Sequence, residues 1–333
     1  MKIKTFVPLV ALLCITCTKE NNNGVLTANE GNNAIASQPA DAIPLNDLGA
    51  NLFREYMGGL YPGGSNVASG NYAVDLLQIS SSIAPLDTFG KASANGKITF
   101  ISLGASIGGK NMKALIKKTV NNPVTNPKLI LVNCNEGGQY ASLTSIANPA
   151  DPYWLDVANV MKQQKISFRQ VQVVYLETDD GLLTKKFPDR ANLIKKKIEA
   201  CARTIKKKCV NVKVLYLLGR TRTFNDEAGD AAVWNSEPSP YFFGWACKWA
   251  IEDQINGIVG TEYKGVKKVA PIMTWGFYEW ADSLPRITDN FYWRKSETKD
   301  GLHSNDAGED TLATRFQKFL LTDTYAKKWY AAQ

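Results

Sequence analysis

The sequence contains one histidine, His303, and six cysteines in 333 residues. One histidine is too few for the common histidine-rich metal sites, and no pair of cysteines has zinc-site spacing. We therefore expect no metal and no organic cofactor. Serine-histidine-aspartate chemistry needs an imidazole as general base, and in this chain only His303 can supply it.

Long apolar runs are also missing. The stretch at residues 6–15 follows Lys2 and Lys4 and is too short to cross a bilayer. It ends in Cys14-Ile-Thr-Cys17, which resembles a bacterial lipoprotein signal with Cys17 as the lipidated residue; an ordinary secretory signal is the alternative. We expect anchoring to the outer membrane of a bacterial envelope, facing the periplasm or the surface.

The domain organisation follows from composition. Residues 1–16 fit a signal peptide, and residues 17–45 are rich in Asn, Ala, Ser and Pro without apolar periodicity, as in a flexible tether. From residue 46 to 333 the composition is globular, with no second linker and no internal repeat. We expect one α/β domain there.

Strand-like and helix-like segments alternate along this domain, which predicts a parallel sheet with helices on both faces. Ligands of such sheets bind at the carboxyl ends of the strands. The predicted strands lie near residues 97–103, 129–133, 171–176, 212–218 and 269–274, and the predicted helices near 47–57, 110–118, 153–163, 190–207, 243–256 and 308–320.

A candidate nucleophile follows the first predicted strand. Ser106 lies in the turn Gly104-Ala-Ser-Ile-Gly-Gly109, directly before a helix, where free N–H groups can bind an oxyanion. Asp300 precedes His303 by three residues across a short turn, so its carboxylate can orient the imidazole. An ordinary βα turn containing serine, and a histidine that only hydrogen-bonds, are the alternatives.

The order of these segments resembles the SGNH (GDSL-type) hydrolase family. Ser106 matches the nucleophile, Gly138 in Asn135-Glu-Gly-Gly-Gln139 matches the oxyanion glycine, and Asp300 and His303 match the final Asp-x-x-His block. Gly-Ala-Ser replaces Gly-Asp-Ser, as in a secreted bacterial lipoprotein subgroup that the chain also resembles at 271–282. The resemblance implies a flavodoxin-like three-layer α/β/α sandwich with a central parallel sheet.

The third family block departs from the pattern. Glu177-Thr-Asp-Asp180 stands where the family has Gly-x-Asn-Asp. A neutral amide suits an oxyanion hole, whereas an ionised carboxylate opposes the developing charge. The resemblance therefore implies an oxyanion hole from the N–H groups of Ser106 and Gly138, with the Thr178 hydroxyl as a third donor.

Three residues are candidate substrate contacts. Arg220 follows a predicted strand and can bind an acidic substrate or pair with Glu177, Asp226 or Glu237. Glu237 and Tyr241 lie in the loop before the next helix and can line the pocket. Aromatic residues at 234, 245, 275, 278 and 280 suit carbohydrate stacking or the hydrophobic core.

The formal net charge of +8 shows no pattern typical of nucleic-acid binding, and its densest cluster, within residues 195–208, fits a solvated helix face. A basic exterior would still attract anionic polysaccharide. Cys134, Cys201, Cys209 and Cys247 leave disulfide connectivity open.

These observations predict an exported, lipid-anchored serine esterase or deacetylase acting on acylated glycans. We expect a monomer that contacts the membrane through its anchor and does not bind nucleic acid. A catalytically inactive glycan-binding lipoprotein of the same fold is the alternative.

Overall fold

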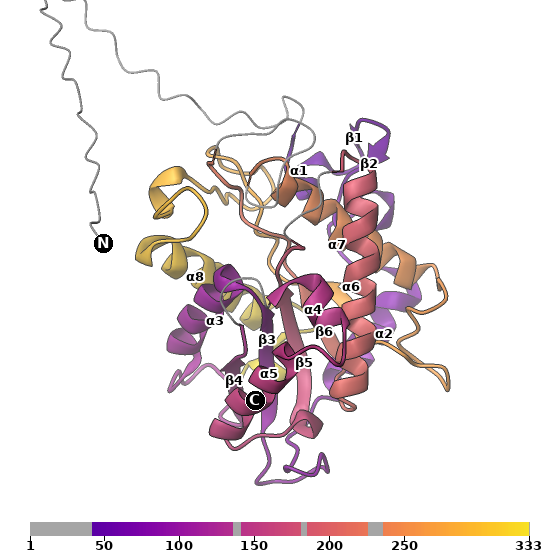
Figure 1. The fold of residues 1–333 in the computed structure, drawn as a ribbon, viewed down its shortest axis with the longest axis vertical. Helices are drawn as coiled ribbons and strands as arrows, with labels where there is room; N and C mark the ends of the chain where they lie inside the picture. The colour runs from indigo at the N-terminus through magenta and orange to yellow at the C-terminus, as the bar shows by residue number, and fades with distance from the viewer. Residues whose placement is uncertain (1–41, 136–140, 181–184, 226–235, 333) are drawn as a thin grey trace, which may run out of the picture. The chain divides into compact units, whose positions relative to one another are not determined.

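The structure, a computed structural model, describes residues 42–135, 141–180, 185–225 and 236–332. These residues lie in one compact unit, Ala36–Gln333. Its centre is a five-stranded parallel sheet with the order β4-β3-β5-β6-β7 (Figure 1). The strands are β3 (Ile98–Gly104), β4 (Leu129–Asn133), β5 (Val171–Glu177), β6 (Val214–Leu217) and β7 (Ile272–Trp275).

This strand order determines where a site can form. Strand β4 pairs with one side of β3, whereas β5 pairs with the other side, and β6 and β7 follow β5 in the sheet. The connections after β3 and after β5 therefore diverge, and in open sheets of this kind ligands bind beside the carboxyl ends of the strands at such a point. The flavodoxin-like α/β/α expectation is confirmed.

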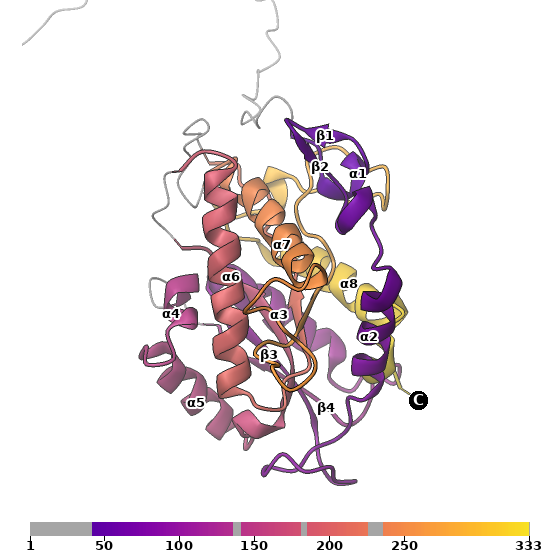
Figure 2. The ribbon, with the colours of Figure 1, turned by 90° about the vertical axis from the view of Figure 1, so that its right-hand side faces the viewer.

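The sheet is buried because helices cover both faces. Every residue of β3 and β5 is buried, which explains their nearly continuous apolar sequences. Helix α3 packs against α8, while α6 packs against α4 and α7; Figure 2 shows α6 and α7 side by side. The main helices are α2 (Gly70–Ser81), α3 (Ser106–Thr119), α4 (Leu143–Ala147), α5 (Tyr153–Gln163), α6 (Asp189–Lys208), α7 (Ser239–Ile255) and α8 (Asp306–Thr322).

Side chains cap the outer edge of β7. The Tyr72 hydroxyl donates to the Met273 carbonyl at 2.5 Å, and the Met273 N–H donates to Gln254 Oε1 at 2.6 Å. Satisfying both groups of Met273 removes part of the unpaired edge that could otherwise recruit another strand. Tyr72 belongs to α2, so this helix completes the edge of the sheet.

All five predicted strands and five of the six predicted helices are present. The predicted helix at 47–57 is wrong: α1 (Leu45–Leu48) ends at Gly49, whose φ is +53°, and a two-stranded ribbon follows. Helices α2 and α4 were not predicted. The remaining short elements are β1 (Leu52–Phe53), β2 (Tyr56–Met57), α9 (Lys327–Tyr330) and three 3₁₀ turns, Pro62–Gly64, Phe168–Gln170 and Lys295–Glu297.

Gly104, which ends β3, allows a close approach that a side chain would prevent. Its φ is +144°, and a Cβ there would lie 1.9 Å from the Glu177 carbonyl oxygen. We expect Gly104→Ala to lower the free energy of unfolding by more than about 3 kcal/mol.

The matched control is Gly265→Ala, where φ is +73° but no atom lies within 4 Å of the added Cβ. This control isolates the backbone cost of a positive φ, about 1 kcal/mol. Equal denaturation midpoints and slopes for the two variants in urea would show that the close approach contributes nothing.

Candidate active site

Ser106, His303 and Asp300 form a hydrogen-bonded series. Ser106 Oγ lies 3.0 Å from His303 Nε2, and His303 Nδ1 lies 2.8 Å from Asp300 Oδ2. The residues come from the start of α3 and from the turn before α8, 197 positions apart in the case of Ser106 and His303. The geometry matches a nucleophile, a general base and the carboxylate that orients it.

The turn that carries His303 is held by Asp300 itself. Asp300 Oδ1 accepts from the backbone N–H of His303 at 2.7 Å and of Leu302 at 3.0 Å. The His303 N–H, together with the His303 ring and the Leu302 N–H, lowers the pKa of Asp300 to about 2. Asp300 is therefore ionised at any pH above about 3, although its side chain is 55 % exposed.

Lys110 connects the two halves of this arrangement. It lies one turn after Ser106 on α3, and its Nζ donates to the Ser304 carbonyl at 3.2 Å and to Glu309 Oε1 at 2.6 Å. Ser304 follows His303 directly, and Glu309 lies in the first turn of α8. This contact sets the distance between the serine-bearing helix and the histidine-bearing turn.

Two asparagines at the end of β4 hold the first turn of α3 from the other side. Asn133 Nδ2 donates to the Gly109 carbonyl at 2.9 Å, and Asn135 Nδ2 donates to the Ala105 carbonyl at 3.3 Å. The backbone N–H of Asn135 donates to Asn133 Oδ1 at 3.1 Å, which links the two amides. The sequence Asn-Cys-Asn did not predict that these asparagines hold the first turn of α3, because asparagine amides are equally common in ordinary turns.

The start of α3 is also the electropositive end of that helix. Ala105, its N-cap, makes no side-chain capping hydrogen bond. The first N–H groups of a helix have no partner within it and can face an anion. A tetrahedral oxyanion formed at Ser106 would lie close to these donors.

Beneath this turn lies a buried carboxyl, Glu177. A Cβ on Gly108 would lie 2.7 Å from Glu177 Oε2 and 2.7 Å from Asn135 Nδ2, so a larger residue there would displace the ends of these two side chains. Burial raises the pKa of Glu177 to about 7, opposed by the charge of Arg220 and by the Tyr175 hydroxyl, which donates to Oε2 at 3.1 Å. Burial and then the charge of Glu177 raise the pKa of Glu279 well above its usual range.

The third-block residues point away from an oxyanion role. The Thr178 hydroxyl is buried and donates to the Ala141 carbonyl at 2.5 Å, so its proton is engaged there. Asp179 accepts from Arg220 at 2.7 Å and from Arg190 at 3.2 Å. Asp179 thus belongs to a buried ion cluster rather than to an open rim.

The candidate substrate contacts lie in the interior. Arg220 is 3 % exposed and pairs with Asp179, which was not among its expected partners. Glu237 is fully buried and accepts from the Thr223 N–H at 2.9 Å, and burial raises its pKa to about 7. Tyr241 is fully buried and its hydroxyl donates to the Ile43 carbonyl at 2.8 Å. None of these side chains presents surface to a ligand in this structure.

The structure also places most of the other residues that the sequence singled out. Trp245, Trp275, Tyr278 and Trp280 are at most 3 % exposed and belong to the core. The cysteines at 134, 201, 209 and 247 are buried and form no disulfide with one another. Gly138, Cys17 and Trp234 lie outside the described residues. Within the described ranges there is no group of three or more potential metal ligands and no helix long and apolar enough to span a membrane.

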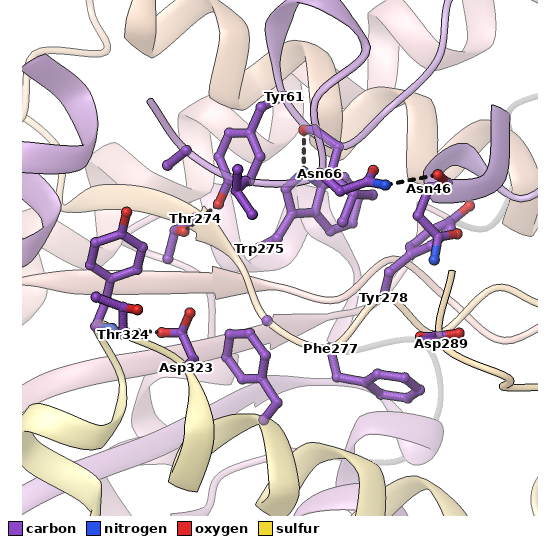
Figure 3. A pocket seen from close by; sticks show the side chains of 16 residues that line it. Asn46, Tyr61, Asn66, Thr274, Trp275, Phe277, Tyr278, Asp289, Asp323 and Thr324 are labelled. Carbon is purple, nitrogen blue, oxygen red and sulfur yellow. Dashed lines mark hydrogen bonds between the residues drawn. The ribbon is translucent and has the colours of Figure 1, made fainter. Parts of the chain in front are cut away.

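A pocket of about 310 Å³ lies elsewhere, at the end of β7 (Figure 3). Its floor is tied together by Tyr61, whose hydroxyl lies 2.9 Å from Thr274 Oγ1, and by the Trp275 indole N–H, which donates to the Leu60 carbonyl at 2.6 Å. Asp289 and Asp323 stand on its sides. None of the three residues of the hydrogen-bonded series lines it.

No family model matches this chain, and no curated protein matches its sequence. Among solved structures, it is similar to the salicylyl-acyltransferase SsfX3 from a tetracycline biosynthetic pathway. The identity is 11 % and the TM-score 0.36, and the alignment covers 71 % of this chain and 58 % of that one.

The buried carboxyls make stability depend on pH. Because the folded-state pKa of Glu177 and of Glu279 lies above the usual 4.5, the folded state holds more protons than the unfolded state between pH 4.5 and about 7. We expect the free energy of unfolding to fall as pH rises through this window, and the fall to be shallower in Glu279→Gln than in the wild type. Urea denaturation at pH 5, 6, 7 and 8 measures it.

Asp310→Asn serves as the control, since that side chain is 70 % exposed. Its pH profile should follow that of the wild type. A Glu279→Gln profile as steep as that of the wild type would contradict the assignment of the pH dependence to the buried pair.

Proposed function

We propose that this protein is a serine hydrolase of the SGNH type, acting on ester bonds of acylated glycans. The observation that carries the proposal is the series Ser106 Oγ, His303 and Asp300, with distances of 3.0 and 2.8 Å. The strand order supports it, since Ser106 follows the strand beside the divergence point of the sheet.

In the proposed reaction, Ser106 Oγ attacks the acyl carbon and transfers its proton to His303 Nε2. The imidazolium, held by ionised Asp300, then gives that proton to the leaving alcohol oxygen as the ester C–O bond breaks. Water, deprotonated by His303, then attacks the acyl carbon. His303 returns that proton to Ser106 Oγ as the bond between the acyl carbon and Oγ breaks, and the carboxylic acid leaves. The first N–H groups of α3 and the expected Gly138 N–H stabilise each oxyanion.

The choice of an acylated glycan rests on the expected export and anchoring at Cys17, which place the enzyme among envelope polysaccharides. The buried positions of Arg220, Glu237 and Tyr241 remove the argument for an acidic sugar.

The decisive variant is Ser106→Ala. We expect the wild type to react with a fluorophosphonate probe and to hydrolyse p-nitrophenyl acetate, and Ser106→Ala to lose both by at least about 10³-fold. Asp300→Asn should keep the fold but lower kcat by about 10²- to 10⁴-fold, because the amide cannot stabilise the imidazolium. Since the pKa of Asp300 is about 2, protonation of Asp300 should not affect the rate above about pH 3.

Ser81→Ala, an exposed serine on α2, is the control and should behave as the wild type. Equal ester hydrolysis by the wild type and Ser106→Ala would exclude Ser106 as nucleophile. A wild type inert towards the probe and a broad acyl-ester panel would favour the binding-protein alternative, which the engaged Thr178 proton also supports.

The proposed lipid anchor has its own test. Cys17→Ser should move the protein from the membrane fraction to the soluble fraction of expressing bacteria, because serine cannot accept the thioether-linked lipid. Metabolic labelling with an alkyne fatty acid should mark the wild type but not the variant. Retention of Cys17→Ser in membranes after a high-salt wash, or its continued labelling, would contradict anchoring at this residue.

A further inference from the structure

The end of the sheet opposite Ser106 is strongly basic. Residues 203–213 contain Arg203 and four lysines and no acid, and residues 256–269 contain three lysines and one glutamate. The two segments therefore carry seven of the chain's formal net charge of +8. From the sequence alone the charge had no pattern; folding concentrates it at one end.

Hydrogen bonds and mutual repulsion show that the two segments adjoin. Arg203 Nη1 donates to the Gly260 carbonyl at 3.0 Å. The pKa of Lys206 is lowered to about 8, first by partial burial and then by the charge of Lys268. Partial burial, and then the charge of Lys268, also lower the pKa of Lys213. Lys206, Lys213 and Lys268 thus crowd together without enough acid to neutralise them.

The acids nearby are already engaged. Asp75 pairs with Lys264 at 2.5 Å, Glu262 accepts from the Gly260 N–H at 2.9 Å, and Asp87 accepts backbone N–H groups in its own loop. An external anion would therefore meet little competition at the remaining lysines.

Exposed apolar side chains accompany this charge. Val259 is 90 % exposed, Val266 105 %, Val210 53 % and Phe89 72 %. Phe89 joins the same surface because Asn211 Nδ2 donates to the neighbouring Gly90 carbonyl at 3.1 Å. We define the basal patch as these four apolar residues with the lysines at 206, 207, 208, 213, 267 and 268.

The basal patch lies at the amino ends of the strands. Its segments lead into β6 at Val214 and into β7 at Ile272, whereas Ser106 and the catalytic turn follow carboxyl ends. In both ribbon views the loop after α7 and the last turn of α6 lie at the lower part of the domain (Figures 1 and 2). A partner on the basal patch would leave the site at the other end facing solution.

We propose that the basal patch docks on the anionic surface of a lipid bilayer. Clustered lysines attract phosphate headgroups, and apolar side chains projecting among them insert into the interfacial region. A nucleic acid or a polysaccharide would satisfy the lysines but gain nothing from Phe89, Val259 and Val266, so the apolar tips favour the bilayer. This contact is independent of the proposed ester chemistry.

Docking through the basal patch would also orient the domain relative to the membrane that holds the proposed lipid anchor. Residues 17–41 number 25, and a chain of that length spans at most about 85 Å. That reach is sufficient for the basal patch to touch the membrane that holds Cys17. The active-site end would then face away from the bilayer.

The test is co-sedimentation of the full chain carrying Cys17→Ser with vesicles of phosphatidylcholine, alone or with 30 % phosphatidylglycerol. We expect binding to the anionic vesicles that weakens with added salt, and a drop in the partition coefficient of at least about tenfold for Lys206→Glu/Lys268→Glu. Val259→Ser/Val266→Ser should also weaken binding, and at high salt this loss should persist.

The matched controls make the same kinds of substitution, two lysines to glutamate and two exposed apolar residues to serine, outside the basal patch. Lys113→Glu/Lys318→Glu lies on α3 and α8, and Leu284→Ser/Ile287→Ser removes exposed apolar residues away from the basal patch. Neither should alter the vesicle partition coefficient, and all variants should keep the wild-type circular dichroism spectrum.

Equal partitioning of the wild type and Lys206→Glu/Lys268→Glu would overturn the proposal. So would tighter binding to dextran sulfate or to duplex DNA than to anionic vesicles, with no effect of Val259→Ser/Val266→Ser. That second result would identify a polyanion site instead.

Discussion

The candidate site depends on one close approach, that of the first turn of α3 to the end of β5. The Glu177 carbonyl occupies the space beside Gly104, so that position has no room for a Cβ. The Glu177 carboxyl lies beside Gly108, and a Cβ there would displace it. Ser106 lies between these two glycines and takes its place from this contact. The amides of Asn133 and Asn135 fix the turn from β4, and Lys110 fixes its distance from the histidine turn.

The same contact places the carboxyl of Glu177 next to the turn that carries Ser106. Glu177 is 1 % exposed, so water cannot solvate its charge, and burial raises its pKa to about 7. Glu279 has a further raised pKa, and Arg220 supplies a compensating charge. A protonated or compensated carboxyl opposes a developing oxyanion far less than a bare carboxylate would. The departure of residues 177–180 from the family pattern is thus compatible with the proposed chemistry.

Local patterns explain which parts could be predicted. The buried strands, and the Asp300–His303 turn, follow from residues that are neighbours in sequence, and Ser106 follows from its place between a strand and a helix. Arg220 could not be resolved in this way, because its partner Asp179 lies 41 positions away and a strand-end arginine can face either solvent or core. The burial of Tyr241 could not be predicted either, because Tyr241 lies on α7, which is buried around nearly its whole circumference and has no polar face to mark the interior side. Glu237 precedes this helix and is buried as well.

The fold distributes the charged residues unevenly between the two ends of the sheet, which composition alone could not show. At the site end, Asp179 is paired with Arg190 and Arg220, and the Asp300 carboxylate faces the His303 ring. At the amino ends of the strands, Lys206 and Lys268 come from segments 62 positions apart and meet without acids to neutralise them. The basal patch therefore concentrates positive charge at this end of the domain. An anionic surface would turn that end towards itself before any contact forms, and the opposite end, with Ser106, would point outward.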